Sequence, residues 1–175
     1  MKKKIFFGGV GGVFLTIVGF MLYDTATMEM EVLILCSANQ GGIRIPSSLC
    51  HYYMVNYRIN EQGIKELSDG AGLDYILNGE SPKNYEFAKI FLANGLDVDG
   101  INHYDPKGAT PLQAAVVYND VKRVKFLLEY GADIHITGGE EMTALEMARK
   151  FHKEESKLQN RSEIIQILSD AENTD

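Results

Sequence analysis

Cysteine, histidine and basic residues are scarce in this sequence. The 175 residues include 2 cysteines and 4 histidines, and 17 Lys and Arg stand against 24 Asp and Glu, for a net charge of -7. The deficit of positive charge argues against nucleic-acid binding, which depends on Lys and Arg that neutralise phosphates. The two cysteines have only His51 nearby, so the usual four ligands of a structural zinc site are lacking.

The sequence motifs of common enzyme classes are also lacking. Ser47 and Ser48 lie near His51 but not in a G-x-S-x-G elbow, and His152 has no H-E-x-x-H spacing. There is no P-loop and no G-x-G-x-x-G sequence. We therefore expect a protein that is not an enzyme and has no cofactor or metal. A hydrolase with a site that these motifs do not describe is the alternative.

The N-terminus combines basic residues with a long uncharged run. Lys2, Lys3 and Lys4 precede residues 5–22, none of which is charged. A membrane-spanning helix needs about 20 apolar residues, so the run is just long enough. We expect a signal anchor in the inner membrane at 5–23, with 1–4 cytoplasmic and the C-terminal domain periplasmic, by the positive-inside rule. A cleaved signal peptide is the alternative, but the apolar core is long and no convincing A-x-A site follows it.

We interpret residues 24–46 as a linker and N-terminal segment. The two cysteines, Cys36 and Cys50, flank a loop at the end of this segment. This segment contains an apolar run at 28–35 that fits either a strand or the start of a helix. In an oxidising compartment a disulfide between Cys36 and Cys50 would contribute roughly 3 kcal/mol by loop closure. Two buried free thiols are the alternative.

Residues 108–135 predict two short antiparallel helices. Thr110 is a good N-cap, and Pro111 suits the first helical position because its missing N–H has no intrahelical partner there. Asp120 can cap the second helix, and Gly131 stands where a helix often ends in a left-handed residue. Apolar stripes predict the packing faces, with these residues on them: Leu112, Ala115, Val116, Val121, Val124, Leu127 and Leu128. The charged residues of the second helix are expected mostly outside its stripe: Lys122, Arg123, Lys125 and Glu129.

This stretch resembles an ankyrin repeat. The family pattern is matched in register by Asp105, Gly108, Thr110, Pro111, Leu112, Ala115, Leu127, Leu128, Gly131, Ala132 and Asp133. Gln113 replaces the family's His, and its amide can still bond neighbouring backbone. Arg123 takes a site that is usually apolar.

The resemblance implies an all-α fold. We expect an ankyrin-repeat solenoid of about three to four helix pairs with atypical caps, preceded by the transmembrane helix. The repeat domain is placed at 47–172, with the following approximate repeats: 47–70, 71–104, 105–137 and 138–172.

The resemblance also implies a protein partner, because ankyrin arrays bind other proteins through their hairpin tips and inner helices. The matching positions, together with a hairpin tip longer than the repeat requires, give these candidate partner-binding residues: Ile101, His103, Tyr104, Lys107, Val117, Tyr118, Met142, Lys150 and Phe151. Aromatic residues among apolar ones are typical of binding hot spots. Packing against an adjacent repeat is the alternative role of Val117 and Phe151.

We therefore expect a membrane-anchored periplasmic protein that binds one protein partner. The most concrete hypothesis is an inhibitor or immunity protein against a secreted toxin such as a lipase effector. A small, anchored, non-catalytic binder would be held where envelope-attacking toxins act. A scaffold or protective partner of a resident periplasmic enzyme is the alternative.

Overall fold

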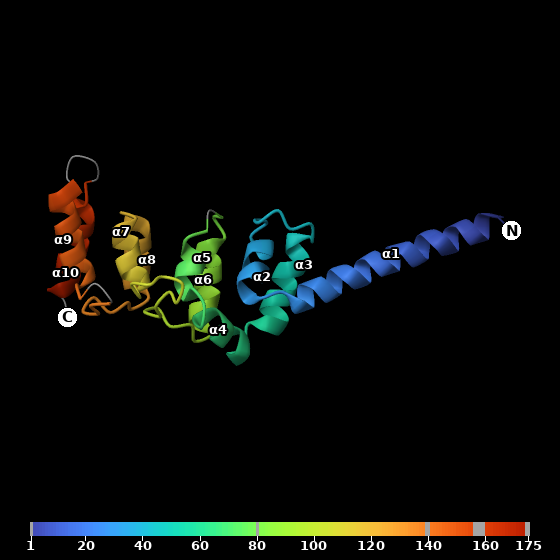
Figure 1. The fold of residues 1–175 in the computed structure, drawn as a ribbon, viewed down its shortest axis with the longest axis horizontal. Helices are drawn as coiled ribbons and strands as arrows, with labels where there is room; N and C mark the ends of the chain where they lie inside the picture. Colours follow the sequence, from blue (N-terminus) through green and yellow to red (C-terminus); the bar gives the residue numbers. More distant parts are fainter. Residues whose placement is uncertain (1, 80, 139–140, 156–159, 174–175) are drawn as a thin grey trace. The chain divides into compact units, whose positions relative to one another are not determined.

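The computed structural model describes residues 2–79, 81–138, 141–155 and 160–173, without the side chains of 2–11, 154 and 155. Every regular element in these ranges is helical and none is a strand, as predicted. The chain divides into two compact units, Met1–Gly63 and Ile64–Asp175 (Figure 1). The boundary between them falls within helix α4 (Glu61–Ser68).

The Met1–Gly63 unit consists of a long helix followed by a small helical cluster. It contains α1 (Lys2–Thr27), α2 (Met30–Ser37), α3 (Ser47–Tyr53) and a π-helical turn η1 (Met54–Arg58) that continues α3 directly. Helix α2 packs against α3 and η1, and α1 also contacts α3. The segment 24–46 thus contributes a packed helix. Helix α3, which begins the predicted repeat 47–70, packs on α2. The predicted domain and repeat bounds stay a prediction.

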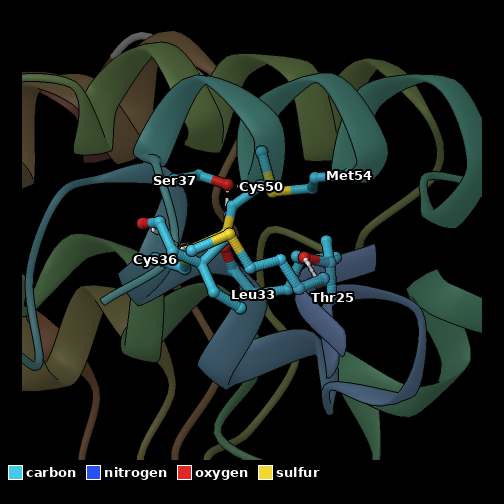
Figure 2. Close-up of a disulfide and its surroundings, with 8 residues drawn as sticks. Thr25, Leu33, Cys36, Ser37, Cys50 and Met54 are labelled. Carbon is cyan, nitrogen blue, oxygen red and sulfur yellow. Dashed lines mark hydrogen bonds between the residues drawn. A yellow bond between two sulfur atoms is a disulfide. The ribbon is translucent and has the colours of Figure 1, made fainter. Parts of the chain in front are cut away.

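A disulfide joins Cys36 of α2 to Cys50 of α3, with the two Cα atoms 5.8 Å apart (Figure 2). Both cysteines are buried, together with Leu33 and Met54. The Ser37 hydroxyl donates to the carbonyl oxygen of Leu33 at 2.7 Å. The bridge therefore lies in the core of this unit, between its two packed helices.

Helix α1 includes the expected signal anchor. In the part of the chain that the structure describes, no helix is both long enough and apolar enough to cross a membrane. The expected segment 5–23 begins among residues whose side chains lie outside that part. The described apolar side chains of α1 are largely exposed, notably Val13, Phe14, Leu15, Ile17, Phe20, Leu22 and Tyr23.

The Ile64–Asp175 unit contains three successive helix pairs in its described residues (Figure 1). They are α5 (Gly72–Leu77) with α6 (Asn84–Ala93), α7 (Pro111–Val117) with α8 (Val121–Glu129), and α9 (Ala144–Glu155) with α10 (Ser162–Glu172). Contacts between α5 and α7, between α7 and α9, and between α8 and α10 stack the pairs in chain order. This is the solenoid arrangement that the sequence predicts.

The capping residues of α7 and α8 act as predicted. The Thr110 side chain accepts a hydrogen bond from the Gln113 N–H, and Pro111 is the first residue of α7. The Asp120 side chain accepts from the Arg123 N–H at 3.0 Å and caps α8. Gly131 follows α8 with a φ of 81°, in the left-handed region where glycine is favoured.

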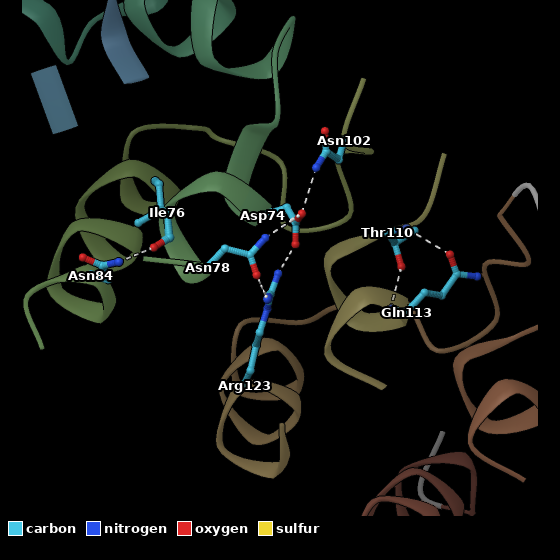
Figure 3. Close-up of polar contacts among 8 residues, drawn as sticks. All are labelled: Asp74, Ile76, Asn78, Asn84, Asn102, Thr110, Gln113 and Arg123. Carbon is cyan, nitrogen blue, oxygen red and sulfur yellow. Dashed lines mark hydrogen bonds and ion pairs between the residues drawn. The ribbon is translucent and has the colours of Figure 1, made fainter. Parts of the chain in front are cut away.

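The prediction that Arg123 lies outside the packing face is wrong. Its side chain is only 2% exposed and forms an ion pair with Asp74 of α5 (Figure 3). Its Nη1 also donates to Asn78 Oδ1 at 2.5 Å, and Asp74 accepts from Asn102 Nδ2 at 2.9 Å. A long arginine can occupy this usually apolar site because the neighbouring repeat supplies a carboxylate to meet it.

Candidate functional site

A cleft of about 300 Å³ lies between the hairpin tip 101–109, which we call the finger, and helices α7 and α9. Its lining residues are Asp105, Lys107, Ala109, Gln113, Val117, Tyr118, Met147 and Phe151. The cleft lies wholly within the Ile64–Asp175 unit, where the inner helices and a hairpin tip meet.

The finger is held in place by hydrogen bonds to its own backbone and to the preceding repeat. The His103 N–H donates to the carbonyl oxygen of Gly70 at 3.0 Å, and Asn102 Nδ2 donates to Asp74 at 2.9 Å. Within the finger, Asp105 Oδ1 accepts from the Lys107 N–H at 3.0 Å. Gly108 has a φ of 57°, a left-handed conformation that lets the chain turn back toward α7. These bonds fix the wall of the cleft that carries Asp105 and Lys107.

Gln113 connects α7 with the hairpin that follows α8. Its Oε1 accepts from the Thr110 N–H at 2.9 Å (Figure 3), and its Nε2 donates to the carbonyl oxygens of Ile136 at 3.1 Å and Met142 at 2.9 Å. The prediction that this amide bonds neighbouring backbone is therefore confirmed. Because its polar atoms are used within the protein, Gln113 contributes a fixed surface to the cleft.

The α9 wall is held by Arg161, whose guanidinium carbon lies 5.4 Å from the centre of the Phe151 ring. Arg161 is buried, and it donates from Nε to the Val116 carbonyl oxygen at 3.3 Å and from Nη2 to that of Val117 at 3.2 Å. It thus satisfies carbonyl groups at the C-terminal end of α7, which a helix leaves without intrahelical partners. The same side chain thus contacts both Phe151 of α9 and the end of α7 that carries Val117.

The structure brings together four of the predicted partner-binding residues: Lys107, Val117, Tyr118 and Phe151. Tyr118 is 64% exposed, and Val117 is 43% exposed. Phe151 is half-buried, so it both packs and lines the cleft.

The other predicted partner-binding residues do not line the cleft. Ile101, His103 and Tyr104 are exposed on the finger, and Lys150 is exposed on α9. Met142 is half-buried, and its carbonyl oxygen accepts from Gln113. Their role in binding stays a prediction.

Met147 also lines the cleft, although its residue type and position alone did not predict this. Met147 is largely buried and precedes Phe151 by four residues on α9. Residues four apart lie on the same face of a helix, so helical spacing from Phe151 could have identified it. Together with Val117 and Tyr118 they form an apolar surface with charged Asp105 and Lys107 at the finger side. This composition suits an apolar side chain of another protein.

Away from the cleft, Asp99 connects two successive hairpin tips. Its carboxylate accepts from the Asp133 N–H, at 3.1 Å to Oδ1 and 3.0 Å to Oδ2. Partial burial, with Asp97 and Asp133 nearby, raises the pKa of Asp99, although the Asp133 N–H acts in the opposite direction. In the residues that the structure describes, no group of three or more acidic, histidine or cysteine side chains could hold a metal ion.

Comparisons with known proteins agree with this architecture. The ankyrin-repeat family model, which represents three copies, matches residues 78–138. Among curated proteins, the chain is similar to ARF GTPase-activating protein Git of Drosophila melanogaster, with 36% identity over 66 residues, 38% of this chain and 9% of that protein. DNA-binding protein RFXANK of Homo sapiens is 44% identical over 48 residues, 27% of this chain and 18% of that protein. Alpha-latrotoxin-Lg1a of Latrodectus geometricus is 32% identical over 73 residues, 42% of this chain and 5% of that protein.

The chain thus covers less than a fifth of the length of each of these relatives. No solved structure matches the chain. Ankyrin repeats are generally protein-interaction domains rather than enzymes. With the helix pairs, the capped turns and the family match in agreement, the chain contains ankyrin repeats.

Proposed function

We propose that this ankyrin-repeat protein binds one protein partner in the cleft between the finger, α7 and α9. The observation that carries the proposal is the meeting of Lys107, Val117, Tyr118 and Phe151 around one cleft. These residues come from three separate elements, so their convergence is a property of the fold. Burial of such a surface by a partner would remove exposed apolar area from water, at roughly 25 cal/mol per Å².

Tyr118 is the expected anchor of this contact. It is the C-cap residue of α7, and the core does not use its side chain, which is 64% exposed. Tyrosine offers a large apolar area with little side-chain entropy to lose, and its hydroxyl can make a directed hydrogen bond. Because Val117 and Phe151 lie beside it, a partner side chain would contact all three residues at once.

We further propose that the protein is anchored in the inner membrane through residues 5–23, with its repeats in the periplasm. The uncharged run after Lys2, Lys3 and Lys4 supports this topology. The Cys36–Cys50 disulfide supports it independently, because such bridges persist in oxidising compartments. A phosphatase fused after Asp175 should be active, since that enzyme folds only when exported. An inactive phosphatase together with an active cytosolic reporter at the same position would contradict the topology.

In that location, the proposed role is inhibition of a secreted toxin such as a lipase effector. A family that binds proteins and generally lacks catalysis fits an inhibitor that acts by covering a partner. Membrane attachment would keep it at the surface that a lipase attacks, so that local concentration adds to affinity.

The test is capture of the partner by the tagged full-length chain in its native cells, followed by an activity assay of the captured protein. A hydrolytic toxin whose activity falls when the chain is added would support the proposal. A resident enzyme that keeps its activity or gains stability would identify a scaffold instead. Equal capture by the parent chain and a Tyr118→Ala variant would place the binding site outside the cleft.

A further inference from the structure

Three tyrosines form an exposed aromatic cluster on α3 and η1, which we call the tyrosine patch: Tyr52, Tyr53 and Tyr57. Tyr52 and Tyr57 are each 56% exposed. The rings of Tyr53 and Tyr57 are stacked with centroids 5.2 Å apart, and those of Tyr52 and Tyr57 meet edge-on at 6.2 Å. A hydrogen bond with Tyr52 raises the pKa of the Tyr57 hydroxyl. The patch is therefore ordered by its own contacts while most of its surface faces outward.

The π-helical turn is what gathers these rings on one side. In a regular α-helix, residues five apart point about 140° away from each other, because each residue turns the chain by about 100°. Here the Ile59 N–H donates to the Met54 carbonyl oxygen, five residues earlier, at 2.9 Å. Such a wider turn advances less per residue and brings Tyr57 back toward Tyr52.

Tyr52 of the patch lies on the side of α3 that does not pack against α2. Cys50 and Met54 are fully buried, and Cys50 is bridged to α2. Tyr52 is two residues beyond Cys50, about 200° around the helix, and so points away from that interface. Helix α1 contacts α3 and then extends away from the cluster of α2 and α3 (Figure 1). Tyr23, near the C-terminal end of α1, is also exposed.

We propose that the tyrosine patch rests in the headgroup layer of the lipid bilayer at the base of α1. This inference rests on the proposed anchoring through residues 5–23. Tyrosine has an apolar ring and a polar hydroxyl, and it is enriched where a membrane meets water. Residues 52–57 contain no charged side chain, so the contact is one of aromatic rings with lipid and needs no anionic headgroup. Contact at this site would fix how the Met1–Gly63 unit lies on the membrane.

Depth-dependent fluorescence quenching can test this, because the sequence contains no tryptophan. The full-length chain would carry a single substitution, Phe20→Trp, Tyr57→Trp or Tyr104→Trp, and be reconstituted in phosphatidylcholine vesicles with quenchers at the headgroup or deep in the acyl chains. Phe20→Trp reports on the anchor, and Tyr104→Trp is the matched control for an exposed tyrosine on the finger. Circular dichroism and an intact disulfide would show that each variant is folded.

The expected result is that headgroup quenchers reduce the emission of Tyr57→Trp, and deep quenchers that of Phe20→Trp, whereas Tyr104→Trp loses little. The quenching of Tyr57→Trp should not change between low and high salt, since no charge is involved. If Phe20→Trp is quenched and Tyr57→Trp is not, the proposed contact of the tyrosine patch with the bilayer is wrong, whereas the proposed anchoring through residues 5–23 is supported. Absence of quenching at both positions would overturn both proposals. Emission of Tyr57→Trp that responds to protein concentration but not to quenchers would identify a second copy of the chain on the patch, which also contradicts the proposal.

Discussion

Arg123 of α8 and Asp74 of α5 form an ion pair inside the Ile64–Asp175 unit, with side chains only 2% and 8% exposed. Asp74 also accepts hydrogen bonds from Asn78 Nδ2 at 3.0 Å and from Asn102 Nδ2 at 2.9 Å. Because Asn102 belongs to the finger, one carboxylate connects two neighbouring repeats with the wall of the cleft. The pair therefore fixes both the stacking of the repeats and the position of the candidate site.

Removal of Asp74 should be strongly destabilising. Asp74→Ala leaves the guanidinium of Arg123 buried without its charge partner, which typically costs about 3–5 kcal/mol of unfolding free energy. Urea unfolding of the full-length chain would measure this. The matched control is Lys125→Ala, which breaks the exposed pair of Lys125 and Glu163, 2.8 Å apart. That variant should lose only about 0–1 kcal/mol, and equal losses for the two variants would contradict this account.

Two substitutions of Gln113, by alanine and by histidine, should differ in how much they lower the stability of the protein. Gln113→Ala leaves the buried N–H of Thr110 and two carbonyl groups without this partner, and one buried unsatisfied group alone costs roughly 1–3 kcal/mol. Gln113→His restores the residue of the family pattern and should remain closer to the parent protein. Thermal unfolding of both variants measures which of the two is more stable. A histidine variant less stable than the alanine variant would show that the amide geometry is specific to this chain.

Loss of the disulfide should weaken the Met1–Gly63 unit. Replacement of Cys36 and Cys50 by serine removes a cross-link between residues 14 apart, which is expected to cost roughly 3 kcal/mol. Hydrogen exchange in α2 and α3 should therefore accelerate, whereas that in α7 and α8 should not. In the parent protein, a thiol reagent should label the unfolded chain only after reduction. Labelling without a reductant would contradict the presence of the bridge.

Asp99 should make stability depend on pH in a defined direction. Since its pKa is raised in the folded protein, the folded state holds the proton more tightly than the unfolded chain. Stability from this group is therefore fully present below the ordinary pKa of 3.8 and is lost as pH rises through the raised value. Asp99→Asn removes this dependence on pH because an amide does not titrate. The amide oxygen can still accept from the Asp133 N–H, so the hydrogen bond is kept. Urea unfolding at a series of pH values should show the variant gaining on the parent as pH rises, and a constant difference would be contrary evidence.

The helix pair at 108–135 could be predicted from sequence because its signals are local. The caps at Thr110 and Asp120 and the left-handed turn at Gly131 each depend on residues within a few positions. The burial of Arg123 could not be predicted from sequence, because its partner Asp74 lies 49 residues away and no local pattern indicates the contact. The charge of Arg123 suggested that it lies on the exposed face of α8, whereas its tertiary contact with Asp74 places it in the core.

The candidate site was predictable only in part for a similar reason. Four residues that the family positions suggested line one cleft, namely Lys107, Val117, Tyr118 and Phe151, and their role in binding stays a prediction. Which further residues line the cleft depends on the path of the hairpins and on the packing of α9, so Met147 was not predicted. The packing of α2 on α3 likewise depends on a cross-link between segments that carry no repeat pattern.

The affinity of the captured partner for a Tyr118→Ala variant tests the central claim most directly. If Tyr118 anchors the contact, its truncation should cost at least about 2 kcal/mol, roughly thirtyfold in Kd. Tyr52→Ala is the matched control, because Tyr52 is 56% exposed yet lies in the Met1–Gly63 unit and outside the cleft, so the Kd of this variant should change much less. Both variants should keep the circular dichroism and thermal unfolding of the parent protein. An unchanged Kd for Tyr118→Ala would contradict binding in the cleft.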